Sequence, residues 1–413
     1  MLPRPTFGRL LWHRMLLFLP CVALLMVSGL FITTHKPTQA QASLCPSQTF
    51  SQYPNPNPGI SPSLRAITAI SATDVWAVGS YSSTVNTPYQ TLIEQWNGSS
   101  WAVISSPNNG VSYNSLAAIS AVSATDIWAA GSYYDIPSGR SLPLFEHWNG
   151  STWSLVPGPT LPVNTQPAVW GLAAIAANDV WAVGDGYNGH AWTAHWNGTV
   201  WATVSNPSRV ATNLFGVKAF ASNDVWAVGS DAASGSGSIQ LVLHWNGSSW
   251  TSMPIPPINA TQLWAIDGSS PSDLWALGSS YSLSTQQNTA FAEHWNGTAW
   301  TVVPTAPLAN LFNGVFYSVS VLSPTDVFAV GQYQTTNALT MGLVEHWDGT
   351  TWSQVPSNVP APPDDDTLFG VAAISTNNAW AVGWGIVYQP GTQETLIEHY
   401  PGGLGASFAC HVG

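Results

Sequence analysis

A phrase of about fifty residues repeats along this chain and constrains its fold more than any other feature. The phrase is anchored by Asp-Val-Trp or a close variant, and successive anchors lie 52, 53, 45, 49, 53 and 52 residues apart. Such a period is typical of propellers and other arrays in which each repeat stacks on its neighbours. We therefore expect residues 43–413 to form a single repeat domain. The anchors begin at Asp74, Asp126, Asp179, Asp224, Asp273, Asp326 and Asn378.

Each repeat contains four short segments with strand character. In the second repeat these begin at Leu116, Ile127, Leu144 and Trp153, and Asn-Gly separates the last two. Asn-Gly between strands is a strong hairpin signal, because both residues tolerate positive φ. The anchor aspartate suits a tight turn between strands one and two. Seven such repeats predict an all-β, seven-bladed β-propeller of four-stranded antiparallel blades. The blades are expected at about 61–108, 112–159, 167–208, 212–256, 261–306, 313–358 and 366–403.

The seventh repeat lacks a fourth strand, and the chain start supplies one. Thr49-Phe50-Ser51-Gln52 parallels Thr351-Trp352-Ser353-Gln354, the fourth strand of the preceding repeat. We therefore expect residues 47–54 to complete the last blade and close the ring. Closure would bring Cys45 near Cys410, where a disulfide is predicted. In the loop-entropy model, a bond that closes so long a loop contributes about 5 kcal/mol.

The first 42 residues have the character of an export segment. Three arginines precede an apolar run from Met15 to Ile32, and Ala40-Gln41-Ala42 offers a small-x-small cleavage site. The segment is a signal peptide or an uncleaved membrane anchor. In both cases we expect the propeller outside the cell, secreted or tethered. An oxidising location favours the predicted disulfide.

Beyond this segment the chain is strongly acidic. This part contains 20 acidic residues and only four basic ones, Arg65, Arg140, Arg209 and Lys218. Such a surface repels phosphate backbones and anionic headgroups, so nucleic acid is not an expected partner. Membrane contact is expected only through an uncleaved N-terminal segment.

The repeat resembles two known families. Glu146-His147-Trp148-Asn149-Gly150 and the glycine after strand two look like the kelch pattern, while Asn-Gly-Ser-Thr-Trp is similar to the Asp-box of sialidase-type (BNR) repeats. It departs from kelch in having one glycine where kelch has two, and from the Asp-box in having Asn for Asp in most blades. The resemblance implies an exported repeat protein of bacterial type with a propeller scaffold, and no activity carries over from it.

Residues repeated in every blade are interpreted as scaffold. Three tryptophan slots per repeat hold 18 of the 23 tryptophans, which we expect between neighbouring sheets. The third-strand histidines and glutamates are expected to act between blades, and the anchor aspartates in turns. A ring holds these groups too far apart to share a metal ion. No metal site, catalytic residue or cofactor is predicted.

The variable loops give the candidate site. Strand direction places the two-to-three loops and the blade links on one face, and these vary in length and composition; binding residues concentrate on such loops. The column nine residues before the anchors, at the channel mouth, breaks the repeat pattern. It is either a stacking platform for a sugar or peptide, or a hydrophobic plug. The candidate ligand-binding residues are Arg65, Trp170, Phe215, Trp264, Tyr317 and Phe369 from this column, with Tyr133, Tyr187, Trp192 and Trp384 from nearby loops.

Two classes of function remain open. The first is an exported, non-enzymatic binding or scaffold module, expected to be monomeric, that recognises a glycan or an extracellular protein through this face. The alternative is a secreted carbohydrate-active hydrolase of sialidase or glycosidase type. A glycosidase needs two carboxylates on one face, for which Asp135, Asp185 and Asp231 are the loop candidates.

Overall fold

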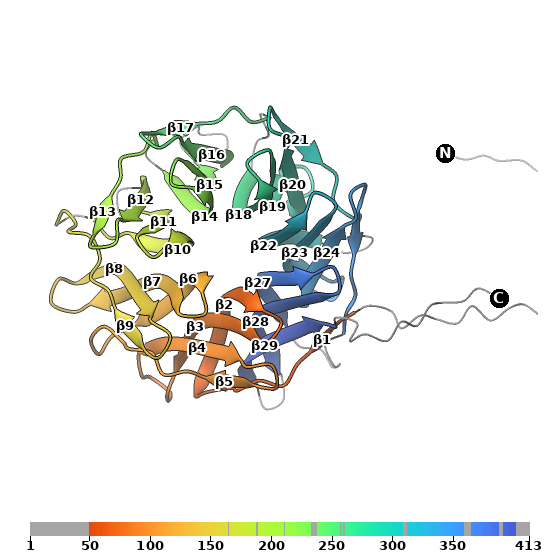
Figure 1. Cartoon of the computed structure of the whole chain (residues 1–413). Helices are drawn as coiled ribbons and strands as arrows, with labels where there is room; N and C mark the ends of the chain where they lie inside the picture. The colour runs from red at the N-terminus through yellow and green to blue at the C-terminus, as the bar shows by residue number, and fades with distance from the viewer. Residues whose placement is uncertain are drawn as a thin grey trace, which may run out of the picture. The chain divides into compact units, whose positions relative to one another are not determined.

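Seven antiparallel sheets stand around a central channel in the computed structural model, as Figure 1 shows. The structure describes residues 49–163, 165–186, 189–209, 211–232, 238–256, 258, 261–308, 312–358, 365–387 and 391–401. The predicted export segment, Cys45, Cys410 and Tyr187 lie outside these residues. Every regular element within them is a strand, and none of them belongs to a helix long and apolar enough to cross a membrane. The predicted seven-bladed all-β propeller is confirmed.

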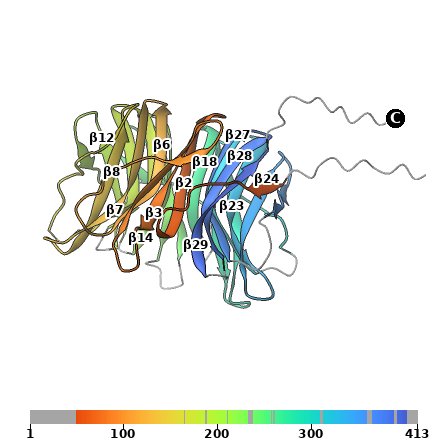
Figure 2. The ribbon, with the colours of Figure 1, turned by 90° about the horizontal axis from the view of Figure 1, so that it is seen from below.

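In the first six blades the strands follow the order of the chain from the channel outward. The first three blades contain β2 (Ile60–Ser71), β3 (Asp74–Ser82), β4 (Tyr89–Trp96) and β5 (Trp101–Val103); β6 (Asn114–Ser123), β7 (Asp126–Asp135), β8 (Arg140–Trp148) and β9 (Trp153–Leu155); and β10 (Ala168–Ala176), β11 (Asp179–Asp185), β12 (Ala191–Trp196) and β13 (Trp201–Thr203). The next three contain β14 (Thr212–Ala221), β15 (Asp224–Asp231), β16 (Ile239–Trp245) and β17 (Trp250–Ser252); β18 (Thr261–Ser270), β19 (Asp273–Ser282), β20 (Gln287–Trp295) and β21 (Trp300–Val303); and β22 (Phe312–Ser323), β23 (Asp326–Gln334), β24 (Thr340–Trp347) and β25 (Trp352–Gln354). Figure 2 shows these strands running across the thickness of the ring.

The seventh blade joins the two ends of the propeller. It contains β27 (Asp366–Ser375), β28 (Asn378–Val387), β29 (Thr392–Tyr400) and, outside them, β1 (Phe50–Gln52). Strand β1 is antiparallel to β29, with Ser51 opposite His399. The chain start therefore supplies the outer strand, as the sequence predicted. A short fifth strand, β26 (Ser357–Asn358), pairs parallel with β1 and was not predicted.

Tryptophan packing between blades explains why the aromatic slots repeat. Trp128 of β7 lies 5.2 Å from Trp196 and 5.8 Å from Trp201 of the next blade, measured between ring centroids. Equivalent contacts link the other blades around the ring. In the seventh blade Phe50 takes the place of the fourth-strand tryptophan and packs 6.1 Å from Phe328. These rings bury apolar area and interact edge to face, which joins one sheet to the next.

The anchor aspartates follow the predicted turns, but they also pair with the third-strand histidines. Asp273 accepts a hydrogen bond from Ser269 across its turn, and His147 Nε2 lies 2.8 Å from Asp126 Oδ1 within one blade. The same pair occurs in five blades, and Asn378 replaces the aspartate in the seventh. The histidine therefore ties strands two and three together, and its predicted inter-blade role is wrong.

The buried third-strand glutamates do face the preceding blade. Glu293 Oε1 accepts a hydrogen bond from Gln240 Nε2 at 3.2 Å, and Glu345 Oε2 accepts one from the backbone of Ala306 at 3.0 Å. Their burial disfavours the charged form, which raises the pKa of both carboxyls to about 7. These groups are scaffold elements between sheets.

Each innermost strand contains a β-bulge near its start. The register of β6 against β7 shifts between Leu116 and Ala118, and the same shift occurs in all seven blades. Opposite the bulge stands the repeated glycine of strand two. A Cβ added to Gly131 would meet the carbonyl oxygen of Ser115 at 2.0 Å. The glycine is therefore required because the bulged backbone comes so close.

Candidate binding site

The bulges place the column residues at the mouth of the channel. Each column residue is the extra residue of its bulge, and a bulge re-aims the side chain it carries. All seven line one cavity of about 790 Å³ along the channel. The structure therefore brings together the six column candidates predicted from sequence, with Ala117 completing the ring. We name these seven residues the collar: Arg65, Ala117, Trp170, Phe215, Trp264, Tyr317 and Phe369.

Five collar residues form a continuous arc of contacts. Phe215 and Trp264 have ring centroids 4.2 Å apart, and Trp264 lies 5.7 Å from Tyr317 in an edge-on arrangement. Tyr317 continues the arc to Phe369 at 5.2 Å. Arg65 ends it, with Cζ 4.2 Å from the centroid of the Phe369 ring. The aromatic side chains of this arc are half-buried, so each is held by its neighbours while part of it faces the channel.

Trp170 stands apart from this arc. Its side chain is exposed, and its indole Nε1 donates a hydrogen bond to Asp185 Oδ1 at 3.0 Å. Ala117 lies between Trp170 and Arg65 in the order of the blades and carries only a methyl group. The collar is therefore an arc of packed rings, with a small residue and an exposed indole on the remaining side.

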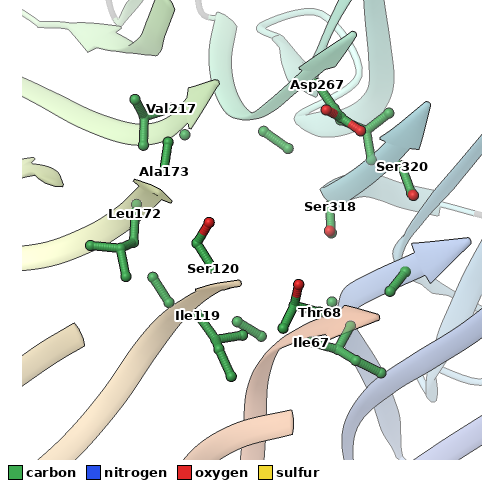
Figure 3. Close-up of a pocket in the computed structure, with 18 of the residues that line it drawn as sticks. Ile67, Thr68, Ile119, Ser120, Leu172, Ala173, Val217, Asp267, Ser318 and Ser320 are labelled. Atoms are coloured by element: carbon green, nitrogen blue, oxygen red, sulfur yellow. The ribbon is translucent and has the colours of Figure 1, made fainter. Parts of the chain in front are cut away.

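Deeper in the channel the polar groups are bonded to one another. Lys218 Nζ lies 2.6 Å from Asp267 Oδ1, and the other oxygen of Asp267 accepts a hydrogen bond from the backbone of Val321. Ser120 and Ser320 accept hydrogen bonds from the backbone of the next blade, both at 3.0 Å. Figure 3 shows side chains of this layer around the channel. These bonds connect neighbouring blades. The polar groups of this layer therefore stabilise the ring beneath the collar and are already engaged with one another.

A second cavity, the side groove, opens beside the collar at the edge of blades seven, one and two. Its volume is about 440 Å³. None of its lining residues is aliphatic: hydroxyl, amide and aromatic side chains account for all of them except one arginine. The residues are Ser61, Ser63, Arg65, Ser80, Tyr89, Tyr113, Asn114, Ser115, Ser132, Tyr133, Tyr134, Ser141, Trp384 and Gln393.

Local irregularity shapes this groove. Strand β2 has a further register shift between Ile60 and Ser63, and Ser61 adopts a left-handed φ of 50°. Tyr89 and Tyr113 stack with centroids 5.9 Å apart, and Tyr113 is 58% exposed. Ser63 is buried at the groove wall, and its hydroxyl has no hydrogen-bond partner among the described residues. The groove thus presents aromatic faces beside hydroxyl and amide side chains.

The loop candidates divide into three groups. Tyr133 and Trp384 line the side groove and meet there although they come from the second and seventh blades. Trp192 is only 7% exposed and packs in the core between blades, so its assignment to a binding surface is wrong. Trp192 is the second residue of β12 and lies on the same face of the strand as Ala194, which belongs to the same core cluster between the blades. The placement of Tyr187 lies outside the described residues.

Sequence reasoning missed Tyr89, Tyr113 and the serines of the groove. Tyr89 begins strand three of the first blade, and Tyr113 immediately precedes strand one of the second. Both positions fall on the variable-loop edge, so strand direction was the signal that could have found them. The serines carry no such signal, because serine is common throughout the loops of this chain.

The carboxylates proposed for a hydrolase do not gather at either cavity. Asp185 is held by Trp170, and Asp135 accepts a hydrogen bond from the backbone of Ser138 at 3.0 Å. Among the described residues lining the two cavities, Asp267 is the single carboxylate, and it is paired with Lys218. The described residues also contain no group of three His, Cys, Asp or Glu arranged to hold a metal ion.

Comparison with known proteins supports the fold. No protein-family model and no curated protein sequence matches the chain, so nothing beyond its residues supports a kelch or Asp-box repeat type. Among solved structures, the chain is similar to YCF48 bound to D1 peptide, with a TM-score of 0.52 and 15% identity over 86% of this chain and 99% of that one. It is also similar to a GH74 xyloglucanase from Xanthomonas campestris, with a TM-score of 0.54 and 12% identity over 84% of this chain and 55% of that one.

A third similar structure is a PL25 ulvan lyase bound to -[GlcA(1-4)Rha3S]-, with a TM-score of 0.53 and 10% identity over 85% of this chain and 94% of that one. These three proteins include a peptide-bound structure and two that act on polysaccharides. At such low identities the likeness shows the propeller fold alone.

Proposed function

We propose that this protein is a glycan-binding propeller that works outside the cell and holds its ligand across the side groove and the collar. The observation that carries the proposal is the composition of the side groove. Aromatic rings stack on the C–H faces of sugars, while hydroxyl and amide groups bond sugar hydroxyls. Ligand pockets for other small molecules are predominantly hydrophobic, and this groove has no aliphatic residue among those that line it.

Placement of the aromatic side chains also supports a carbohydrate ligand. Tyr113 and Tyr134 are exposed, at 58% and 40%, yet they sit beside a cavity and not singly on the surface. Tyrosine offers a large apolar face and a hydroxyl with little conformational freedom to lose on binding.

Hydrolysis receives less support from the site. Glycoside hydrolysis ordinarily requires two carboxyl groups roughly 5–10 Å apart. The described lining of the two cavities offers Asp267 alone, already in an ion pair. A binding function needs no such pair, so it fits the arrangement better.

Binding of the purified protein to a glycan array tests the proposal. Tyr133→Ala and Trp384→Ala should each weaken binding about 10-fold, because each removes one aromatic surface from the groove. Trp264→Ala tests the collar in the same way. Tyr281→Ala is the matched control, since Tyr281 is 38% exposed and lines neither cavity.

Three results would count against the proposal. Unchanged glycan binding in both groove variants would show that the ligand does not bind in the side groove. Binding to peptides but to no glycan would favour the protein-recognition alternative. Release of sugar from a polysaccharide that the protein binds would establish the hydrolase alternative.

A further inference from the structure

Among the described residues, Arg65 alone lines both the channel cavity and the side groove. It is the bulge residue of β2, so its side chain turns from the sheet to the channel mouth. Its guanidinium lies over the face of the Phe369 ring. This cation–π contact does not occupy the N–H groups of the guanidinium. Among the described residues, no acceptor bonds its N–H groups and no carboxylate pairs with it.

Two other cations, Lys218 and Arg140, are already engaged. Lys218 lies in an ion pair with Asp267. Arg140 donates to three backbone carbonyls of residues 162–165, at 2.8 to 3.2 Å. Arg65 differs from these two because, within the part of the chain that the structure describes, no acceptor bonds its five N–H donors at the junction of the two cavities.

The surroundings of Arg65 favour an anionic partner. Solvent reaches the side chain, but the dense channel wall partly desolvates it and lowers the pKa of Arg65 below its ordinary value. Arginine remains charged at neutral pH despite such a shift. A partly desolvated cation without a counter-ion is unfavourable, and an anion bound beside it relieves that cost.

We propose that Arg65 binds the carboxylate of an acidic sugar residue at the collar, with the adjoining sugar units lying in the side groove. This inference rests on the proposed glycan binding and names the class of glycan. The planar fork of a guanidinium matches the two oxygens of a carboxylate, and such bidentate bonds are short and directional. The chain is acidic overall, with a formal net charge of −12, so it repels densely charged polyanions. The ligand class is a mostly neutral glycan with isolated uronate residues.

Matched oligosaccharide pairs test this inference on the full-length protein. Each pair contains one glucuronate, galacturonate or mannuronate residue, or the same residue with its carboxyl reduced to an alcohol. A sulfated counterpart of each neutral sugar separates carboxylate from sulfate recognition. Wild-type protein should bind at least one acid about 10- to 100-fold more tightly than its reduced partner, the range expected for hydrogen bonds to charged groups.

Variants locate the effect. Arg65→Gln should bring the ratio of acid to neutral affinity close to one, because the carboxylate loses its guanidinium partner. Arg65→Lys keeps the positive charge but loses the bidentate geometry of the guanidinium. Its preference for the acidic sugar over the neutral one should therefore lie between those of the wild type and Arg65→Gln. Arg209→Gln removes the same charge from an exposed position outside both cavities, so this variant should keep the full wild-type preference for the acidic sugar. Thermal unfolding of each variant verifies that the ring is intact.

The outcomes separate this inference from the proposed function. Equal binding of acid and neutral sugars by the wild type overturns the carboxylate proposal and leaves glycan binding standing. A preference that survives Arg65→Gln, or tighter binding of the sulfated sugar, also overturns it. Failure to bind any sugar on the array or in the pairs contradicts both.

Discussion

Ring closure by β1 can be tested with one side chain, because Phe50 is the only residue of this three-residue strand that is buried. It is 0% exposed and lies 5.2 Å from Tyr400 and 6.1 Å from Phe328, measured between ring centroids. Truncating a fully buried phenylalanine to alanine costs about 3–5 kcal/mol, from lost burial and the cavity left behind. We expect Phe50→Ala to lower the free energy of unfolding by about 4 kcal/mol.

Guanidinium denaturation of the full-length protein, followed by tryptophan fluorescence, measures this loss. Phe50→Leu keeps much of the volume and should cost less than about 1.5 kcal/mol. Ser51→Ala is the control in the same strand, because Ser51 is half-buried and its pairing with His399 uses the backbone. It should change stability by less than about 0.5 kcal/mol. A loss below about 1 kcal/mol for Phe50→Ala would refute the reasoning that this strand closes the core of the last blade.

Three further predictions concern the repeated scaffold. Asp126→Ala leaves His147 without its partner and should cost about 1–2 kcal/mol in denaturant titrations. Asp126→Asn should be nearly neutral, since an asparagine already holds the histidine of the seventh blade. Burial raises the pKa of Glu146 to about 8, so the folded state binds its proton more tightly than the unfolded state. Stability from this group is complete below about pH 4.5 and is lost as pH rises to about 8, so the thermal midpoint should fall over that range and fall less in Glu146→Gln. Gly131→Ala places a Cβ 2.0 Å from the Ser115 carbonyl oxygen and should prevent proper folding of its blade. Circular dichroism and soluble yield measure this effect. A variant as stable as the wild type would contradict the close approach.

The collar shows how far the sequence reached and where it stopped. Spacing from the anchor aligned seven positions, and strand direction put them at one mouth of the channel. The sequence left open whether these residues form a plug or a platform. The structure shows an arc of half-buried rings that ends in Arg65 over the Phe369 ring and leaves Trp170 exposed. That outcome depends on seven bulges, and a shift of one residue in register decides which way a side chain points.

The sequence by itself determined the period, the four strands of each blade and the completion of the last blade from the chain start. These features are local and repeated, so turn residues and aromatic slots within fifty positions of one another are enough to specify them. Only the tertiary structure decided the partners of the repeated polar residues and the existence of the side groove. Residues as distant as Ser61 and Gln393 line that groove together, because closing the ring places the first blade beside the seventh. No local pattern specifies such a meeting, which depends on the packing of whole blades.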